Sequence, residues 1–363
     1  MLPNKNIQKL KPYLSIPHKI WELENENNIL KLDWNEASIA PSPLVFQKIE
    51  AFLKNGHLNW YPNTKNSLLL DALAKYAGQK NSSFIELFPS SDVAHEFIID
   101  TFVDKDENIG IIAPTYDNFR ARANGVGVQT FFFHLDENFD LDFKALNAFI
   151  INEKIKLLYL CNPNNPTGKV YEIHKIYELI KNNPQCLFLI DEAYYEFCGK
   201  TMATFTEELK NLIITRTFSK AFALASFRVG YIISHYENIQ YLNQIRNSKN
   251  IPMLSQIAAL AALEDVIYME NYVEEVNLAR ADFVDFIYEV AGGGGGVVCD
   301  SVANFVLMKS EDVNSFVGFL EKRGIFIRNY SHIIPKYCRI SIGTREQMKI
   351  LKDKILEYIR QQR

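Results

Sequence analysis

The sequence has few cysteines, and their spacing forms neither a metal-binding nor a disulfide pattern. Among 363 residues there are five, an odd number with no Cys-x-x-Cys pair: Cys161, Cys186, Cys198, Cys299 and Cys338. This usage argues against a disulfide framework and against a zinc ribbon, and it favours free thiols in a reducing compartment.

Long apolar runs are also absent. No stretch approaches the roughly 18 consecutive apolar residues that a membrane-spanning helix requires. The first twenty residues, MLPNKNIQKLKPYLSIPHKI, are polar and lack the apolar segment of a secretory signal peptide. We therefore expect a soluble, cytoplasmic protein.

The charged residues show no excess of one sign that would indicate a polyanionic partner. The chain has 39 Lys and Arg against 43 Asp and Glu, a net charge of −4. This balance argues against a dominant role in binding nucleic acid or a membrane surface. The seven histidines include no HExxH or HxH arrangement, so we expect no metal site.

Three familiar catalytic and nucleotide-binding motifs fail at defined positions. The segment that starts GVG at Gly125 has Thr130 where GxGxxG requires its third glycine. The sequence 199–201, GKT, ends like a phosphate-binding P-loop, but Tyr194 stands where that motif has its first glycine. No GxSxG nucleophile elbow occurs either.

The middle of the chain alternates short apolar runs with polar breaks and helical stretches. Four runs have the length of buried strands: Ile109–Ile112, Leu157–Leu160, Leu187–Ile190 and Leu212–Thr215. Strands that alternate with helices predict an α/β fold with a mostly parallel central sheet sandwiched by helices. The loops after such strands gather at one edge of the sheet, where ligands bind.

After about residue 250 the pattern becomes that of a smaller α+β unit. We expect, in order, a helix at 255–290, a strand at 297–308, a helix at 312–323, strands at 324–328 and 338–342, and a last helix ending near 363. The five glycines at 292–296 predict a flexible loop without chemistry. The predicted division is an N-terminal arm joining the small domain (1–40), a large domain (41–250) and a small C-terminal domain (251–363).

Residues suited to cofactor chemistry follow the predicted strands of the large domain. Asp191 closes the run LFLID, and Lys220 stands in TRTFSKAFALASFRVG. Asn165 lies in CNPNNPTG and Tyr116 in APTYDNF. Each has an ordinary structural explanation, such as a helix N-cap, a turn or a solvated lysine. Their occurrence together, in this order and at these spacings, is far more specific than any one alone.

On these segments the chain resembles the class I and II aminotransferases of pyridoxal phosphate fold type I, most closely their histidinol-phosphate aminotransferase branch. The similarity covers nearly the whole chain, through WNEASIAPSP, NWYP, SSD, PTY, NNPTG, DEAYYEF, TFSKAFALASFRVGY, ANF and RISIGTRE. The resemblance implies the fold of that family and an enzyme that uses pyridoxal 5'-phosphate (PLP).

The resemblance implies catalytic roles for Lys220, Asp191 and Tyr194. Lys220 would hold PLP as a Schiff base and move a proton between the substrate Cα and C4′ of the cofactor. Because an unperturbed lysine has a pKa of about 10.4, the site must lower it, which burial and a nearby Arg228 would do. Asp191 would pair with the pyridine nitrogen and keep it protonated.

The resemblance also implies the other cofactor contacts. Asn165 and Tyr194 would donate to the 3′-oxygen, and Tyr116 would stack on the ring. The phosphate would lie at the start of a helix and meet hydroxyls and a forked cation. The residues implied there are Ser90, Ser91, Asp92, Thr217, Ser219 and Arg228.

A further phosphate contact would come from a second subunit. In the family the tyrosine of the NWYP segment, here Tyr61, reaches the phosphate from the partner. The resemblance therefore implies a homodimer with its sites at the interface. The alternative is that Tyr61 is only an interfacial or core aromatic residue.

Substrate recognition is implied by four further positions. Arg339 in CRISIGTRE matches the arginine that holds the substrate carboxylate or its counterpart, and Asn35 lies in the segment that covers the site. Tyr13 and Arg328 match positions that face the substrate phosphate in the histidinol-phosphate branch. We expect Arg345, near the start of the last helix, to be structural.

The chain departs from that branch at several positions. The usual Asn-Glu-Asn-Pro segment reads Asn-Glu-Ala-Ser, the glycine before the phosphate helix is Ser90, and the acidic residue after Asp92 is Val93. These changes leave the cofactor machinery in place but argue against histidinol phosphate as the substrate. A small phosphorylated ketone or amino alcohol would use Tyr13 and Arg328 without an imidazole pocket.

The expected function is therefore transamination from an amino acid, glutamate by preference, to a small carbonyl compound that is phosphorylated. The alternative is a decarboxylase of a phosphorylated amino acid, of the threonine-phosphate type, on the same scaffold. A transcription regulator built on this body would need an added DNA-binding segment, for which the residues before Tyr13 leave no room.

Overall fold

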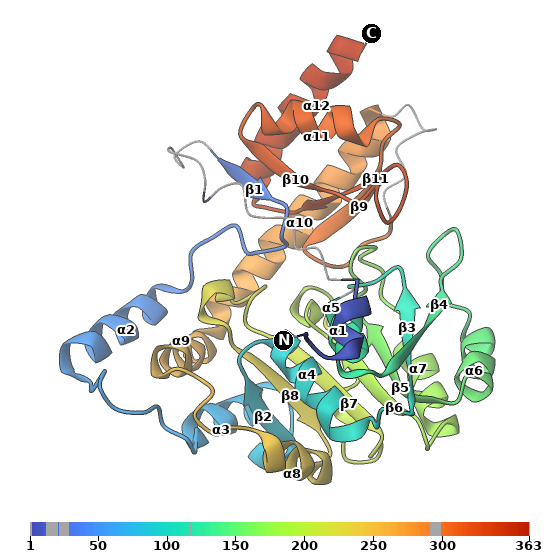
Figure 1. The fold of residues 1–363 in the computed structure, drawn as a ribbon. Helices are drawn as coiled ribbons and strands as arrows, with labels where there is room; N and C mark the ends of the chain where they lie inside the picture. Colours follow the sequence, from blue (N-terminus) through green and yellow to red (C-terminus); the bar gives the residue numbers. More distant parts are fainter. Residues whose placement is uncertain (1, 12–20, 22–28, 117, 291–298, 363) are drawn as a thin grey trace.

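The computed structural model of the chain describes residues 2–11, 21, 29–116, 118–290 and 299–362. Figure 1 shows a large lower part, in which helices flank a central sheet, and a smaller upper part built around a second sheet. The long helix α10 (Val266–Val290) runs from the lower part into the upper one.

The central sheet has seven strands. Their order is β2 (Ile85–Phe88), β8 (Gly230–Ser234), β7 (Leu212–Thr217), β6 (Leu187–Asp191), β5 (Ile155–Cys161), β3 (Asn108–Ala113) and β4 (Gln129–His134). Strand β8 is antiparallel to both of its neighbours, and the other pairings are parallel. The four strands expected from the sequence are β3, β5, β6 and β7, so the predicted α/β class and mostly parallel sheet are confirmed.

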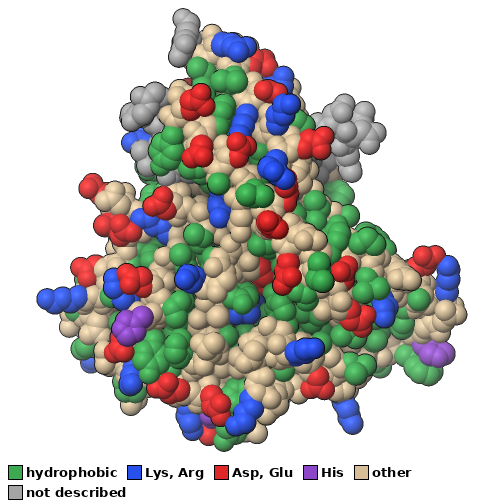
Figure 2. Space-filling model, turned by 180° about the vertical axis from the view of Figure 1, so that it is seen from behind, with side chains coloured by type: hydrophobic (Ala, Val, Ile, Leu, Met, Phe, Trp, Pro, Cys, Tyr) green, Lys and Arg blue, Asp and Glu red, His purple; other side chains and the backbone are tan. Residues whose placement is uncertain are grey.

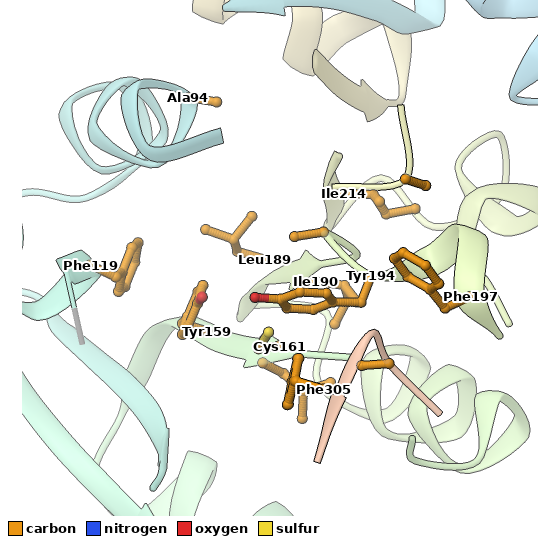
Figure 3. Close-up of a cluster of buried hydrophobic side chains, with 14 of the residues drawn as sticks. Ala94, Phe119, Tyr159, Cys161, Leu189, Ile190, Tyr194, Phe197, Ile214 and Phe305 are labelled. Carbon is orange, nitrogen blue, oxygen red and sulfur yellow. The ribbon is translucent and has the colours of Figure 1, made fainter. Parts of the chain in front are cut away.

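The middle strands are apolar throughout because both of their faces are covered. Every residue of β6, β7 and β8 is buried. The helices of this part are α3 (Ser67–Tyr76), α4 (Ser91–Phe102), α5 (Asn118–Val126), α6 (Phe143–Asn152), α7 (Ile173–Asn182) and α8 (Tyr236–Ile245). In the core between α5 and β5, the rings of Phe119 and Tyr159 stack with centroids 4.6 Å apart (Figure 3).

The second sheet has four strands drawn from both ends of the chain. Their order is β1 (Leu30–Leu32), β10 (Ile325–Asn329), β11 (Tyr337–Ser341) and β9 (Phe305–Lys309). Strand β1 pairs with β10 in parallel, and the other two pairings are antiparallel. Helices α10, α11 (Val313–Glu321) and α12 (Arg345–Gln362) accompany this sheet. The domain boundaries at residues 40 and 250 stay a prediction.

The remaining helices lie beside the large part. The N-terminal helix α1 (Lys5–Lys9) packs against α5. Helix α9 (Met253–Glu264) packs against α3 and against α2 (Pro43–Asn55), which lies at the left of Figure 1, away from the central sheet.

The prediction of one continuous helix over 255–290 is wrong. Helix α9 ends at Glu264 and α10 begins at Val266, because Asp265 leaves the helical conformation at φ −124° and ψ 51°. Its carboxylate accepts a hydrogen bond from the hydroxyl of Ser42, the N-cap of α2. A tertiary contact therefore divides an apolar pattern that is helical on both sides of the break.

The strand expected at 297–308 is shorter and shifted. Among the described residues it covers β9, Phe305–Lys309, because the chain turns just before it. The Ser301 hydroxyl donates to the Phe305 carbonyl at 2.5 Å, and the Val302 amide donates to the Gly168 carbonyl at 3.0 Å. The loop predicted at 292–296 lies outside the described residues.

The surface mixes both charges. On the face that Figure 2 shows, acidic and basic side chains are interspersed among apolar ones. None of the helices in the described part of the chain combines the length and apolar character needed to cross a membrane.

Candidate functional site

A cavity of about 470 Å³ lies where the parallel strands of the large sheet face β10 and β11 of the small one. The predicted site residues that line it are Asn35, Ser90, Ser91, Asp92, Tyr116, Asn165, Asp191, Tyr194, Thr217, Ser219, Lys220, Arg228, Arg328 and Arg339. Tyr61 does not line it, and Tyr13 lies outside the described residues. The predicted edge of the sheet is thus where these side chains meet.

Lys220 enters the cavity from the loop after β7. Its Nζ donates to the Trp34 carbonyl at 3.0 Å and lies 5.8 Å from the centre of the Tyr194 ring. Burial and, to a smaller extent, the positive charge of Arg339 lower the pKa of Lys220 to about 8. The expected lowering is present, but the neighbouring cation is Arg339 rather than Arg228. The amine is therefore neutral in a far larger fraction of molecules near neutral pH, which makes it a better nucleophile.

Asp191 ends β6 with its carboxylate in the floor of the cavity. Tyr159 donates to Oδ2 at 2.9 Å, while the Ala193 amide and the Thr215 hydroxyl donate to Oδ1 at 3.2 and 3.4 Å. Burial raises the pKa of the Asp191 carboxyl, and the nearby His95 and the Tyr159 hydrogen bond oppose that rise. Three uncharged donors, the Tyr159 and Thr215 hydroxyls and the Ala193 amide, therefore orient both oxygens of the carboxylate.

Asn165 and Arg339 are joined directly, although they are far apart in the sequence. Arg339 Nη1 donates to Asn165 Oδ1 at 2.7 Å and to the Tyr330 hydroxyl at 3.2 Å, and Nη2 donates to the Asp33 carbonyl at 2.6 Å. The Nε atom of Arg339 is buried and has no hydrogen-bond partner in the described part of the chain. A buried guanidinium with a donor to spare is suited to an anion that enters the cavity.

Tyr194 and Asn35 form a second link across the cavity wall. Asn35 Nδ2 donates to the Tyr194 hydroxyl at 3.1 Å, and burial raises the pKa of that hydroxyl. Asn35 has φ of 56° and is anchored by Ser341, whose hydroxyl donates to Oδ1 at 3.0 Å, and by Asn304, which donates to its carbonyl at 3.0 Å. The N-terminal segment is thereby held against β11.

The start of α4 lies at another wall of the cavity. Ser90 is its N-cap, and its φ of 89° lies in a region that glycine favours, so a serine there is strained by roughly 1–3 kcal/mol. Gly230 makes this approach possible, because a Cβ on it would lie 2.5 Å from the Ser91 amide nitrogen. The first turn of α4 is therefore held close to the start of β8.

Arg228 lies beside this helix start. One guanidinium nitrogen, Nη2, is 3.6 Å from Asp92 Oδ2, and Nη1 donates to the Ser219 hydroxyl at 3.3 Å. The Ser219 amide in turn donates to the Thr217 hydroxyl at 3.1 Å. Hydroxyls, helix amides and one cation thus converge, and Asp92 partly balances the charge of Arg228.

Arg328 lies on the small-domain side, with its guanidinium carbon 5.5 Å from the centre of the Trp34 ring. Tyr116 lines the cavity from the loop after β3. Arg345 lies elsewhere, at the first residue of α12, where its side chain donates to Glu275 at 3.0 Å.

Tyr61 is far more exposed than the other predicted residues. It is 81% exposed, and the Lys249 amine lies 4.8 Å from its ring centre. Its neighbours Leu58 and Trp60 are 62% and 66% exposed. The segment is therefore an exposed apolar surface in this single chain.

Several residues around the cavity were missed by the sequence reasoning. Trp34 and Tyr330 line it, and His95, Tyr159 and Thr215 surround the Asp191 carboxylate. A usable signal existed for two of them: Tyr159 and Thr215 are hydroxyl residues inside apolar runs predicted to be buried, and buried hydroxyls need partners. Nothing in the sequence pointed to His95. Within the described residues, no group of three or more His, Cys, Asp or Glu side chains is placed to hold a metal ion.

Known proteins of similar sequence perform amino-group transfer. The chain is 64% identical over 362 residues to a dihydroxyacetone phosphate transaminase of Campylobacter jejuni, covering all of this chain and 98% of that one. It is 32% identical over 343 residues to the histidinol-phosphate aminotransferase of Caldanaerobacter subterraneus, covering 94% and 96% of the two chains.

The fold is that of solved aminotransferases. The crystal structure of histidinol-phosphate aminotransferase from Sinorhizobium meliloti, in complex with PLP, superposes with a TM-score of 0.87 over 99% of this chain and 98% of that one, at 24% identity. Residues 27–355 match the family model of aminotransferase class I and II. With this match and these relatives, the chain belongs to the class I and II aminotransferases, which are PLP-dependent enzymes.

Proposed function

We propose that this aminotransferase moves an amino group between glutamate and a small phosphorylated ketone of the dihydroxyacetone phosphate type. One observation carries the proposal: Lys220 and Asp191 meet in one cavity whose opposite wall carries two arginines, Arg328 and Arg339. The 64% identical transaminase supports the choice of ketone.

The residues of the cavity fit PLP. Its aldehyde needs an amine, and Lys220 supplies one with a pKa of about 8. Its protonated ring nitrogen needs a hydrogen-bond acceptor, and the Asp191 carboxylate lines the cavity. Tyr159 and the Ala193 amide already donate to this carboxylate and orient it. Its 3′-oxygen needs donors, for which we assign Tyr194 and Asn165, and Tyr116 is assigned to the ring face.

The cofactor phosphate is assigned to the start of α4. Amides of a helix start and the guanidinium of Arg228 attract an anion, and the hydroxyls of Thr217 and Ser219 add donors. The assigned residues are Ser90, Ser91, Asp92, Thr217, Ser219 and Arg228, all of which line the cavity.

Arg339 and Arg328 are assigned to the substrate. Arg339 has one buried donor without a partner in the described chain, which suits the α-carboxylate of the amino donor. Arg328 is assigned to the far end of the substrate, where glutamate carries a second carboxylate and the ketone carries its phosphate. Asn35 is assigned to the wall of the site beside Tyr194. Tyr13 is assigned to the substrate phosphate on the resemblance alone.

Bound PLP supplies an electron sink that stabilises negative charge at the substrate Cα. The side chains do the rest. Lys220 would accept the proton from Cα and return it on the cofactor side, because burial and Arg339 lower the pKa of its amine to about 8. Asp191 would hold a proton on the ring nitrogen, and Arg339 would bind the substrate carboxylate and so orient the Cα–H bond.

Transamination is favoured over decarboxylation by the sequence relationship. The 64% identical relative is a transaminase, and the 32% identical one is an aminotransferase. The alternative, a decarboxylase, would release carbon dioxide from threonine phosphate without any demand for a carbonyl acceptor.

We also propose a homodimer in which Tyr61 reaches the partner's site. The exposed apolar side chains around it support an interface: Phe46, Leu53, Leu58, Trp60, Tyr61 and Leu68 are 50–81% exposed. The second copy would cover them. The free cysteines among the described residues favour a reducing, cytoplasmic location.

The test is a half-reaction screen with the PLP-loaded enzyme. Glutamate, 2-amino-1,3-propanediol phosphate, histidinol phosphate and threonine phosphate are added singly, and the loss of the visible cofactor band is followed. We expect bleaching by glutamate and by the amino-alcohol phosphate. Arg328→Ala is expected to raise KM for the phosphorylated amine about tenfold more than for its unphosphorylated form, since it removes a charged hydrogen-bond donor. Bleaching by neither amine, or equal effects of the substitution on both forms, would overturn the proposed substrate.

A further inference from the structure

A chain of polar contacts leads from α4 through β7 to Asp191. His95 projects from α4 and is only 2% exposed. Its Nε2 lies 2.9 Å from the Thr215 hydroxyl and 3.9 Å from Asp191 Oδ2. The polar contacts that this ring makes with described residues therefore lead to Asp191, directly or through Thr215.

Donor and acceptor chemistry gives these contacts a direction. An ionised carboxylate only accepts hydrogen bonds, so the Thr215 hydroxyl donates to Asp191 Oδ1. That uses its single proton, and the hydroxyl oxygen then accepts from the Nε2–H of His95. The order is His95 to Thr215 to Asp191.

The surroundings of this chain are apolar. The His95 ring meets Tyr159 edge-on at 5.5 Å and Phe119 edge-on at 5.9 Å, and those two rings stack on each other (Figure 3). In such a place a carboxyl tends to take up a proton, and burial does raise the pKa of Asp191. His95 and Tyr159 act against that rise, whereas the Asp92 carboxylate adds to it.

Packing alone gives no reason for this arrangement. Replacing both partners of a buried hydrogen bond by apolar side chains of the same shape can leave the stability nearly unchanged, so a core does not require the polar pair. His95 and Thr215 occupy core positions that hydrocarbon side chains would fill, and their polar atoms converge on one carboxylate.

Resting on the proposed function, in which Asp191 pairs with the ring nitrogen of PLP, we propose that His95 is a positioning residue. Through Thr215 it orients the Asp191 carboxylate and keeps it negative, so that the carboxylate holds the ring nitrogen in its protonated form. Tyr159 holds the other oxygen.

Four variants of the PLP-loaded enzyme test this. His95→Leu and Thr215→Val remove the chain, His95→Gln keeps an N–H donor, and Phe119→Leu disturbs the same packing without touching a hydrogen bond. For the first two we expect kcat of the glutamate half-reaction to fall about tenfold, the rate equivalent of one hydrogen bond to a charged group, with little change in KM. The visible cofactor band should shift in its pH midpoint. The Gln variant should recover most of kcat, and the Phe119 variant should behave as wild type in both readouts.

A double variant and a cofactor analogue complete the test. Because His95 and Thr215 form one chain, the double variant His95→Leu/Thr215→Val should lose no more than either single one. Reloading with a PLP analogue that has carbon in place of the ring nitrogen should erase the spectral difference between wild type and His95→Leu.

The outcomes separate this proposal from the one on which it rests. Additive losses, or equal loss in the Gln and Leu variants, would show that His95 acts through packing and overturn its positioning role. If instead the analogue leaves the wild-type spectrum and rate unchanged, the pairing of Asp191 with the ring nitrogen fails, and the proposed cofactor geometry fails with it. If His95→Leu does not fold, the Thr215→Val and His95→Gln variants carry the same comparison.

Discussion

Two carboxylates that are neighbours in the chain lie in opposite surroundings. Asp191, at the end of β6, faces the cavity and is held by Tyr159, Thr215 and a backbone amide. Glu192 is fully buried on the other side and forms an ion pair with Arg216, whose Nε donates to Oε2 at 2.9 Å. Glu192 directly follows the last residue of β6, and successive side chains of extended backbone point to opposite faces, which separates the two carboxylates.

The covered side holds a buried ion pair with further hydrogen bonds. Glu192 also accepts from the Thr201 hydroxyl at 2.8 Å and from the Met202 amide at 2.7 Å. The guanidinium carbon of Arg216 lies 3.5 Å from the centre of the Tyr195 ring. The charges of Glu192 and Arg216 are therefore paired with each other and hydrogen-bonded, which is the requirement for burying an ion pair.

The cavity side differs because, in the described part of the chain, no arginine or lysine forms an ion pair with its acid. Asp191 accepts from hydrogen-bond donors, and His95 Nε2 lies 3.9 Å from its Oδ2. The lesson is that a buried acid compensated by a cation serves stability, whereas one held only by neutral donors is left able to bind a cation from outside. The cavity face should therefore control activity and the covered face should control folding.

The largest effect is expected at Lys220. Lys220→Ala should lower kcat by roughly 10²–10⁴-fold, because the variant loses both its covalent hold on PLP and its proton-transfer group. Borohydride treatment followed by mass measurement should find cofactor attached to wild type and none attached to the variant. Unchanged trapping would place the attachment site elsewhere and end the assignment of the cavity face.

On the covered face, Glu192→Gln should lower the free energy of unfolding by about 3–5 kcal/mol, because it leaves the buried Arg216 charge without its partner. Urea unfolding measures the change. The matched control is Glu207→Gln, which breaks an exposed pair with Lys80 and should change stability by less than about 1 kcal/mol. If both substitutions have the same small effect, the contrast between the faces is lost.

Asp191→Asn should show the reverse pattern. It keeps the shape of the side chain but removes the charge, so kcat should fall by about 10²–10³-fold, as for other preorganised charge contacts. The free energy of unfolding should change little, and bound PLP should be retained. Near-normal turnover in this variant would contradict the role that we assign to the cavity face.

The smallest effect concerns pH on the covered face. Burial raises the pKa of Glu196 from 4.5 to about 7, although Arg216 opposes the rise. The folded chain then binds this proton more tightly than the unfolded chain, so the free energy of unfolding should fall as pH rises from about 4.5 to 7. The expected loss is about 3 kcal/mol. Glu196→Gln should remove that slope in urea titrations at several pH values, and an unchanged slope would assign it to another group.

Much of the fold was predictable because it rests on local patterns. The apolar runs that became β3, β5, β6 and β7 are recognisable by length and by the breaks after them. The position of Asp191 at a strand end followed from the same reading. The break at Asp265 was not predictable, because a hydroxyl more than two hundred residues earlier in the chain stabilises it.

The candidate site was predictable in part. Most of the predicted residues line one cavity, but their roles stay predictions, and Tyr61 lies outside it in a single chain. The expected partner of Lys220 was Arg228, and the structure has Arg339 instead. Which of the two arginines influences Lys220 depends on how the small sheet packs over the large one.

By itself the sequence determined the class of fold, the edge of the sheet at which ligands bind, and the residue types that meet there, because strand length, alternation and loop chemistry are local properties. Only the tertiary structure decided which charges and donors became neighbours: Arg339 with Asn165, Asn35 with Tyr194, and His95 behind Asp191. These pairs join segments up to 174 residues apart, and their distances depend on the packing of whole elements.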